Sequence, residues 1–368
     1  MERTLILHIG TPKTGTTSIQ SFLHDNRCVL ETKGICYPDT RKYCKENGID
    51  IGMAMNNVQN GGFFEHFVPL GVKKIYINQL LQNTDFVKIF DYIFSCFDCC
   101  DKVILSDESL WLRDISELLN FFYTKKIMIK VVVYFRNQID YIESFWKHDI
   151  KMGLFTGSFT DFWKKRKDSA VRESLFYYRK LTDVANVISK QNIVARLYNT
   201  NSHKGNRNWL IEDFMGVLGL ELDEGYCAKR VYENTSLFGS ALIMKNKFNE
   251  LGIDDSRGSF RQLFIQMSQQ LVNENPSIKN TTFITQEMEQ HILQDLLEDN
   301  HMLRQEYFSN IDEPIFDEFI KERIEEHIYG FNEDMFRFLI IYMQNEIALL
   351  TDMNARIDDI KNMILPEV

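Results

Sequence analysis

The stretch RTLILHIGTPKTGTTSIQ, residues 3–20, constrains the fold of this chain more than any other. Residues 3–10 form an apolar run that ends at a glycine, which predicts a buried parallel strand. Beyond the loop, apolar residues at 19, 22, 23, 29 and 30 have helical spacing. A glycine-rich turn between a strand and a helix N-terminus presents backbone N–H groups to an anion, so we expect a phosphate site here.

The loop departs from the Walker pattern of nucleoside triphosphate sites, G-x-x-x-x-G-K-[ST]. Gly10 and Gly15 have the required separation, but Thr16 stands at the lysine position and Lys13 lies inside the loop. Gly15 permits close backbone approach, and Thr16, Thr17 and Ser18 add hydroxyl donors. The loop alone therefore leaves open a triphosphate or another phosphate-bearing ligand.

Further strands are predicted at residues 102–106, 127–135 and 192–198, with helical patterns between them. This alternation predicts an α/β fold: a three-layer sandwich with a mostly parallel central sheet and helices on both faces. From about residue 230 the pattern becomes helix after helix, which predicts helical C-terminal additions.

Composition narrows the function classes. The net charge is −10, from 42 Lys+Arg against 52 Asp+Glu, and the longest basic cluster is KKRK at 164–167. Nucleic-acid binders carry a basic surplus, so we expect a small-molecule site instead. No apolar run approaches the roughly 18 residues of a membrane span. The first residues lack a signal-peptide pattern, and we expect a cytoplasmic protein.

Cys96, Cys99 and Cys100 form a C-x-x-C-C motif among seven cysteines. No second Cys/His pair lies at ligand spacing, whereas structural zinc usually has four ligands. We therefore expect reduced thiols and no metal.

A second block of residues begins with Arg136, which follows the strand predicted at 127–135. Ligands of open α/β sheets bind at the carboxyl ends of strands. Ser144 lies eight residues further on, about two turns along the next helix. An arginine fork and a hydroxyl suit a second phosphate. The alternative is that Arg136 merely caps the sheet and Ser144 is exposed.

The two blocks, PKTGTTS at 12–18 and RNQIDYIESFW at 136–146, resemble sulfotransferases that use 3′-phosphoadenosine 5′-phosphosulfate, particularly bacterial carbohydrate sulfotransferases. The resemblance implies a P-loop-NTPase-like fold, no metal, and transfer to a hydroxyl or amine, on a carbohydrate-type acceptor. It implies that the 3′-phosphate is held by Arg136 and Ser144 and the 5′-phosphosulfate by the loop residues Lys13, Thr14, Gly15, Thr16, Thr17 and Ser18. The family's usual proline is replaced by Gln138.

The resemblance also implies a catalytic base near the donor sulfate, with Lys13 stabilising charge on the leaving phosphate. The segment KVILSDESL offers Glu108, which we take as the base. Asp107 is the alternative, although either carboxylate could instead cap the following helix. His66 is a third candidate, and His8 is expected to be a buried, satisfied histidine.

The predicted sulfotransferase domain covers residues 1–308, with a helical acceptor-side part at about 230–308, and an extension covers 309–368. Within the extension, a helix predicted at 335–365 has apolar residues close to heptad spacing, and it either packs on its own domain or dimerises as a coiled coil. Two other functions stay open: a P-loop small-molecule kinase using Asp107 for Mg²⁺, or an inactive nucleotide-binding or oligomeric scaffold.

Overall fold

The computed structural model describes residues 3–50, 63–68, 72–198, 206, 208–227, 236–252, 259–311, 315–316 and 321–323. The chain forms two compact units, and a boundary between them falls inside helix α9 (Gln138–Lys151). The first unit takes Met1–Ile142, Lys164–Glu233 and Glu287–Phe319, and the second takes the intervening segments and the C-terminal end. The domain limit placed at residue 308 stays a prediction.

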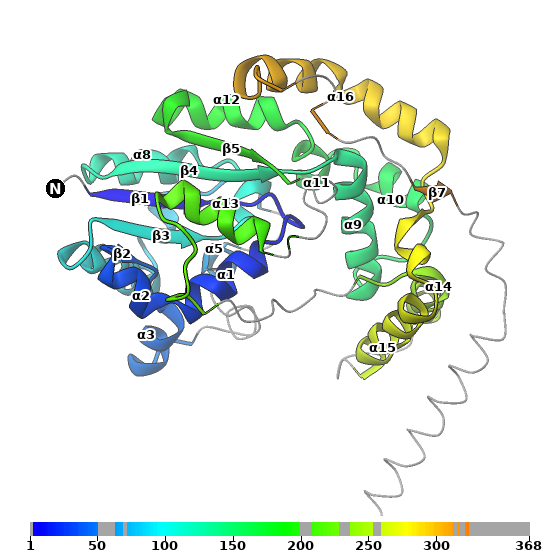
Figure 1. Cartoon of the computed structure of the whole chain (residues 1–368), viewed down its shortest axis with the longest axis horizontal. Helices are drawn as coiled ribbons and strands as arrows, with labels where there is room; N and C mark the ends of the chain where they lie inside the picture. The colour runs from blue at the N-terminus through cyan, green and yellow to red at the C-terminus, as the bar shows by residue number, and fades with distance from the viewer. Residues whose placement is uncertain are drawn as a thin grey trace, which may run out of the picture. The chain divides into compact units, whose positions relative to one another are not determined.

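The first unit holds the large sheet and most helices (Figure 1). Its strands are β1 (Thr4–His8), β2 (Ile35–Cys36), β3 (Lys102–Ser106), β4 (Met128–Phe135) and β5 (Ile193–Leu197). Its helices, besides the start of α9, are α1 (Thr16–Asp25), α2 (Arg27–Thr32), α3 (Thr40–Glu46), α5 (Phe63–Phe67), α6 (Ile77–Leu80), α7 (Thr84–Ser95), η1 (Cys96–Asp98), η2 (Glu108–Leu112), α8 (Ser116–Thr124), α11 (Ala170–Glu173), α12 (Tyr177–Ile188), η3 (Lys190–Asn192), α13 (Trp209–Leu218) and α16 (Gln286–Tyr307).

The large sheet is parallel throughout, with strand order β2-β3-β1-β4-β5. β1 lies at the centre, where His8 is in register with Ser106 of β3 and Val132 of β4. The glycine loop follows this central strand directly. The predicted α/β fold is thus confirmed, and the parallel sheet with its glycine loop makes it P-loop-like.

Side chains of the central strands alternate between two cores, as a buried parallel sheet requires. Leu5 and Leu7 of β1 pack in one core with α7, α8 and α12, whereas Ile6 packs in the other with α1 and α13. The helices therefore cover both faces, and the predicted three-layer arrangement is confirmed.

Sequence periodicity located four strands of this sheet but missed β2, whose two residues are too few for a pattern. The helix predicted after the loop is two helices, α1 and α2, because Asn26 interrupts it. The Asn26 side chain donates to the carbonyl of Cys227 and accepts from its N–H, at 3.0 and 2.6 Å. This contact spans 201 residues, so local spacing could not predict it.

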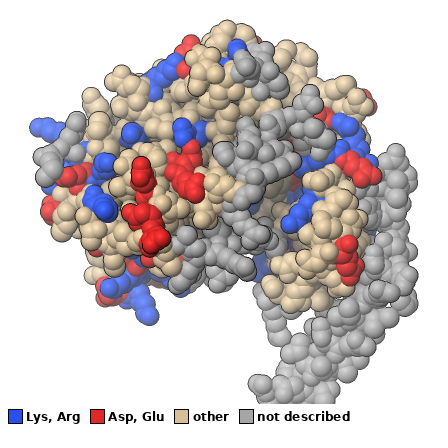
Figure 2. All heavy atoms as spheres, viewed as in Figure 1, with Lys and Arg blue, Asp and Glu red and all other residues tan. Residues whose placement is uncertain are grey.

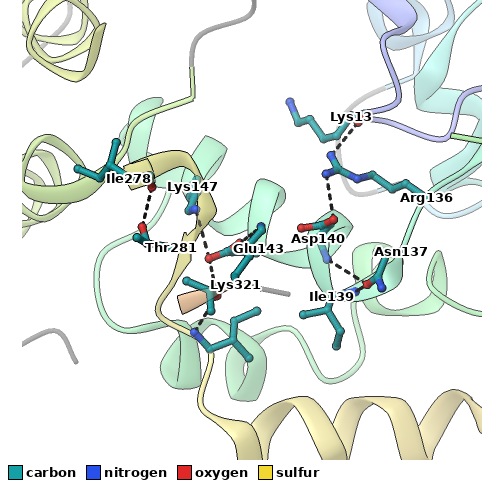
Figure 3. Close-up of polar contacts among 12 residues, drawn as sticks. Lys13, Arg136, Asn137, Ile139, Asp140, Glu143, Lys147, Ile278, Thr281 and Lys321 are labelled. Carbon is teal, nitrogen blue, oxygen red and sulfur yellow. Dashed lines mark hydrogen bonds and ion pairs between the residues drawn. The ribbon is translucent and has the colours of Figure 1, made fainter. Parts of the chain in front are cut away.

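The second unit contains the rest of α9, most of α10 (Phe159–Lys165), α14 (Gly239–Glu250), α15 (Ser259–Glu274), η4 (Pro276–Asn280), β6 (Thr281–Thr282) and β7 (Glu322–Arg323). The last two residues of α10 belong to the first unit. β6 and β7 pair in parallel. Beside them, buried Glu143 accepts from Thr282 Oγ1 at 2.7 Å. It also accepts from Lys321 Nζ at 2.8 Å and pairs with Lys147 at 3.2 Å (Figure 3). One carboxylate thereby links α9 to β6 and to the residue that precedes β7.

On the face shown in Figure 2, basic and acidic side chains are interspersed over the described surface. None of the helices in the described ranges combines the length and apolarity that a bilayer crossing demands. The helix predicted at 335–365, with its proposed dimer contact, lies outside the described residues.

Candidate active site

The glycine loop has the backbone geometry of an anion cradle. Gly10 and Gly15 have φ values of 105° and 76°, in the left-handed region that favours glycine. A Cβ at Gly15 would lie 2.4 Å from Leu210 Cδ2, so a larger residue there would require that leucine to move. Lys13 also has a positive φ, of 66°. A non-glycine residue held in that region is strained, and such strain clusters at functional sites.

The glycine loop is held by hydrogen bonds to β4 and by one hydrogen bond within the loop. Thr11 donates through its N–H and its Oγ1 to the carbonyl of Tyr134 on β4, each at 3.0 Å. Thr14 Oγ1 donates to the carbonyl of Thr11 at 2.5 Å. Thr14 is therefore buried and used inside the loop, so its hydroxyl holds the cradle's shape.

The first turn of α1 faces the loop with unsatisfied donors. In the described chain, the N–H groups of Thr16 and Thr17 have no protein acceptor, as expected for a helix start. Thr16 Oγ1 is buried and likewise has no hydrogen-bond partner among the described residues. A buried orphan hydroxyl is costly unless something binds it. These donors fit a phosphate or sulfate group, and Ser18, half-buried, lies next on the same turn.

Arg136 brings the second block to the first. Its Nη1 donates to the carbonyl of Lys13 at 3.0 Å, and its Nη2 lies 3.6 Å from Asp140 (Figure 3). The guanidinium also lies over the ring of Tyr198, 5.9 Å from its centroid. Its Nε is buried without a hydrogen-bond partner among the described residues. An arginine so placed beside the loop can offer an anion a charged donor.

The residues after Arg136 fix the start of α9. Asn137 Oδ1 accepts from the N–H of Ile139 at 2.8 Å, which is an N-cap contact. Gln138, at the position where the family has proline, is buried, and its Nε2 donates to Asn300 Oδ1 at 2.5 Å. The start of α9 is therefore tied to α16 through this side chain.

Ser144 is half-buried on α9, beyond the boundary between the two units. Its role as a ligand of the 3′-phosphate stays a prediction.

The two carboxylates after β3 differ sharply in their surroundings. Asp107 is 2% exposed, and its oxygens accept from the N–H groups of Ser109 at 2.9 Å and Phe64 at 2.8 Å. Burial raises the pKa of Asp107. Glu108 is half-buried and accepts no hydrogen bond within the described chain. A Cβ on Gly10 would approach the Glu108 Cα to 3.4 Å, so this backbone runs against the loop. Asp107 thus has the capping role, whereas Glu108 keeps its oxygens available.

The histidines occupy different settings. His66 is half-buried on α5, whose residue Phe64 is the one bonded to Asp107. His8 is fully buried, and its Nδ1 lies 2.8 Å from Ser106 Oγ, while its Nε2 has no hydrogen-bond partner in the described ranges. Burial lowers the pKa of His8 to about 3, so it stays neutral. The expectation of a buried histidine is correct, but only one nitrogen is satisfied.

Sequence reasoning missed Tyr198 as part of this site. It follows β5, lies under the Arg136 guanidinium, and would contact a Cβ on Gly15 at 3.5 Å. Its place at the carboxyl end of a predicted strand was the available signal.

The cysteine motif forms no comparable site. All seven cysteines are free, and Cys96 is hydrogen-bonded with Cys36 of β2. Across the described ranges, no group of three or more His, Cys, Asp or Glu side chains is arranged to hold a metal.

Solved structures similar to this chain include two sulfotransferases. A sulfotransferase from Alicyclobacillus acidocaldarius matches over 68% of this chain and 93% of its own, with 13% identity and a TM-score of 0.38. The sulfotransferase domain from the curacin biosynthetic pathway matches over 64% and 79%, with 9% identity and a TM-score of 0.36. No protein-family model and no curated protein matches the chain. Because these identities and TM-scores are low, the fold assignment rests on this chain's own strand order and glycine loop.

Proposed function

We propose that this protein is a sulfotransferase that uses 3′-phosphoadenosine 5′-phosphosulfate as donor and an acceptor hydroxyl or amine, carried by a carbohydrate-type molecule. The observation that carries the proposal is the contact between Arg136 and Lys13. It sets a guanidinium beside an anion cradle at the carboxyl edge of the sheet. A donor with phosphates at both the 5′ and 3′ positions needs two such groups, whereas ATP needs only the first.

The residues present fit this donor. The free donors at the start of α1, with Thr16 Oγ1, suit the 5′-phosphosulfate, and Arg136 suits the 3′-phosphate. Ser144 as its partner is carried over from the family resemblance. The donor supplies a sulfuryl group joined to phosphate through an oxygen, and that S–O bond breaks as the acceptor oxygen or nitrogen bonds to sulfur.

Two side chains would act on the reacting groups. Glu108 would take the proton of the acceptor hydroxyl or amine, since its oxygens are not held by other described groups. Lys13 would stabilise the negative charge that the departing 5′-phosphate gains. A lysine and backbone N–H groups can neutralise that charge, so the proposed reaction requires no metal.

Titration calorimetry tests the donor assignment. We expect 3′-phosphoadenosine 5′-phosphate to bind about 10-fold or more tightly than AMP without Mg²⁺, since each charge-assisted bond adds appreciable free energy. Equal affinity for the two nucleotides would overturn the proposal. Tight Mg²⁺-dependent binding of ATP would instead support the kinase alternative, which the burial and double capping contact of Asp107 disfavour.

A further inference from the structure

A cavity of about 310 Å³ lies in the first unit, beside the residues that follow Glu108. Its wall includes Ile9, residues 110–116 and Lys180 of α12. A backbone bridge holds one side, because Ile75 donates to the carbonyl of Asp114 at 3.0 Å. The volume is at the lower end of ligand pockets, a size that suits a single sugar ring or a similarly small molecule.

Two residues of the cavity wall, Ile9 and Leu110, lie close to candidate site residues in the chain. Ile9 immediately precedes Gly10, the first residue of the glycine loop. Leu110 follows Glu108 by two residues on the same 3₁₀ turn, which advances about 4 Å over that distance. A molecule in the cavity would therefore lie close to the loop and to the candidate base.

Most charges in the wall already have partners. Lys73 pairs with Glu173 at 2.6 Å, and Lys74 pairs with Asp114 at 3.7 Å. Arg113 is buried and donates to the carbonyls of Ser109 and Val68 at 2.8 and 3.1 Å. These groups shape the wall through contacts within the protein.

Lys180 differs from the other basic residues. Its Nζ donates to the carbonyl of Arg113 at 3.5 Å and lies 5.7 Å from the centroid of the Trp111 ring. Among the described residues it makes no ion pair with a carboxylate. Lys180 is half-buried, and burial lowers its pKa, although the negative charges of Asp183, Glu173 and Asp114 oppose that shift. An ammonium has three donors, and only one long contact is made here.

A half-buried ammonium that makes no ion pair with a described residue can bind an anion through its remaining donors. A further wall residue, Asp183, is an exposed carboxylate that can accept hydrogen bonds from ligand hydroxyls. The wall thus combines one ammonium that can bind an anion with an acceptor for hydroxyl groups.

We propose that this cavity receives the acceptor, and that Lys180 selects acceptors in which an anionic group, a carboxylate or a sulfate ester, accompanies the hydroxyls. The inference rests on the proposed function, which leaves the acceptor's charge open. It assigns Lys180 a specificity role and no part in the chemical step.

Binding measured without donor tests the inference directly. We expect methyl β-glucuronide to bind the full-length protein about 10-fold or more tightly than methyl β-glucoside, as one hydrogen bond to a charged group implies. Glucose 6-sulfate distinguishes the two anions: preference over glucose shows that a sulfate ester is accepted, and its absence restricts the site to carboxylates. Equal binding of the acidic and neutral glycosides would overturn the inference.

Variants assign the effect to Lys180. Lys180→Gln should remove the preference for the glucuronide, and Lys180→Arg should keep most of it. Lys190→Gln is the matched control, because Lys190 is an exposed lysine paired with Glu306 at 2.6 Å. A preference that survives Lys180→Gln in a folded protein would overturn the assignment.

A parallel titration separates this inference from the donor assignment. Binding of 3′-phosphoadenosine 5′-phosphate should be the same in wild type, Lys180→Gln and Lys190→Gln. Normal binding of that nucleotide, with no glycoside preference, would overturn the acceptor inference and leave the proposed function intact. If the wild type binds 3′-phosphoadenosine 5′-phosphate no more tightly than AMP, the proposed function itself is overturned, whichever glycoside binds.

Discussion

Arg136 Nη1 donates a hydrogen bond of 3.0 Å to the carbonyl of Lys13, across 123 residues of sequence. The bond joins the end of β4 to the loop that follows β1, and these strands are neighbours in the sheet. One residue can thereby position the loop and bind an anion beside it. The family resemblance assigned only the second of these tasks to Arg136.

Arg136→Lys tests both tasks. Lysine keeps the charge but not the planar fork, so the contact with Lys13 and forked binding of an anion cannot both persist. We expect affinity for 3′-phosphoadenosine 5′-phosphate to fall about 10- to 100-fold, with a smaller loss for AMP. Calorimetry measures both, and Arg3→Lys, at an exposed pair with Asp98, is the control. Equal losses for the two nucleotides would assign Arg136 to loop positioning alone.

Glu108→Gln should lower turnover, whereas Asp107→Asn should lower stability. Glu108→Gln removes the proposed base, so turnover should fall about 100-fold or more while thermal stability is retained. Asp107→Asn turns an amide N–H toward one of two backbone donors, which should cost about 1–2 kcal/mol of stability. Turnover with labelled donor and thermal unfolding check the pair. A Glu108→Gln enzyme with normal turnover would transfer the base role to another group, with His66 the next to test.

Much of the site could be predicted because its signals are local. The glycine loop, the strand before Arg136 and the acidic pair after β3 each lie within a few residues of a recognisable pattern. The features that the sequence did not predict depend on contacts between residues far apart in the chain. Asn26, where the predicted helix is interrupted, bonds to Cys227, and Gln138 bonds to Asn300, 162 residues away. The cavity around Lys180 needs segments from four places in the chain.

The contact between Gln138 and Asn300 predicts energetic coupling. Gln138 is buried and Asn300 is half-buried, so loss of either side chain leaves a polar group without its partner. Single variants Gln138→Ala and Asn300→Ala should each cost about 1–2 kcal/mol, and the double variant should cost less than their sum. Urea unfolding of the four proteins measures this. Gln138→Pro, which introduces the residue found in the sulfotransferases that the motif resembles, should also destabilise the protein. Additive effects of the single variants would contradict the coupling.

Because of Glu143, we expect the stability of the second unit to fall in acid. Burial alone would raise its pKa, but Lys147 and Lys321, with the hydrogen bonds from Lys321 and Thr282, lower the pKa to about 2. Because the folded-state pKa lies below the ordinary value of 4.5, its stabilisation is present above that pH and is lost as pH falls toward about 2. The loss amounts to about 3 kcal/mol.

Glu143→Gln tests this network. It leaves two lysines facing a neutral amide, and breaking such a buried pair should cost about 3–5 kcal/mol near neutral pH. The variant should also lose the part of the acid sensitivity that Glu143 supplies. Hydrogen exchange of β6 and α14 reports on the second unit separately. Unchanged exchange in Glu143→Gln would show that the network contributes nothing.

Because of His8, we expect the stability of the first unit also to fall in acid, over a different pH range. Burial lowers its pKa to about 3, below the ordinary value of 6.5, so the unfolded chain binds a proton that the folded protein refuses. Stability should therefore decline as pH falls from 6.5 toward about 3, by at most about 1.4 kcal/mol per pH unit. His8→Gln cannot take up that proton and should flatten the decline, whereas His291→Gln, an exposed control, should not. Urea unfolding at a series of pH values compares the three proteins. Parallel curves for wild type and His8→Gln would mean that the acid loss comes from other groups.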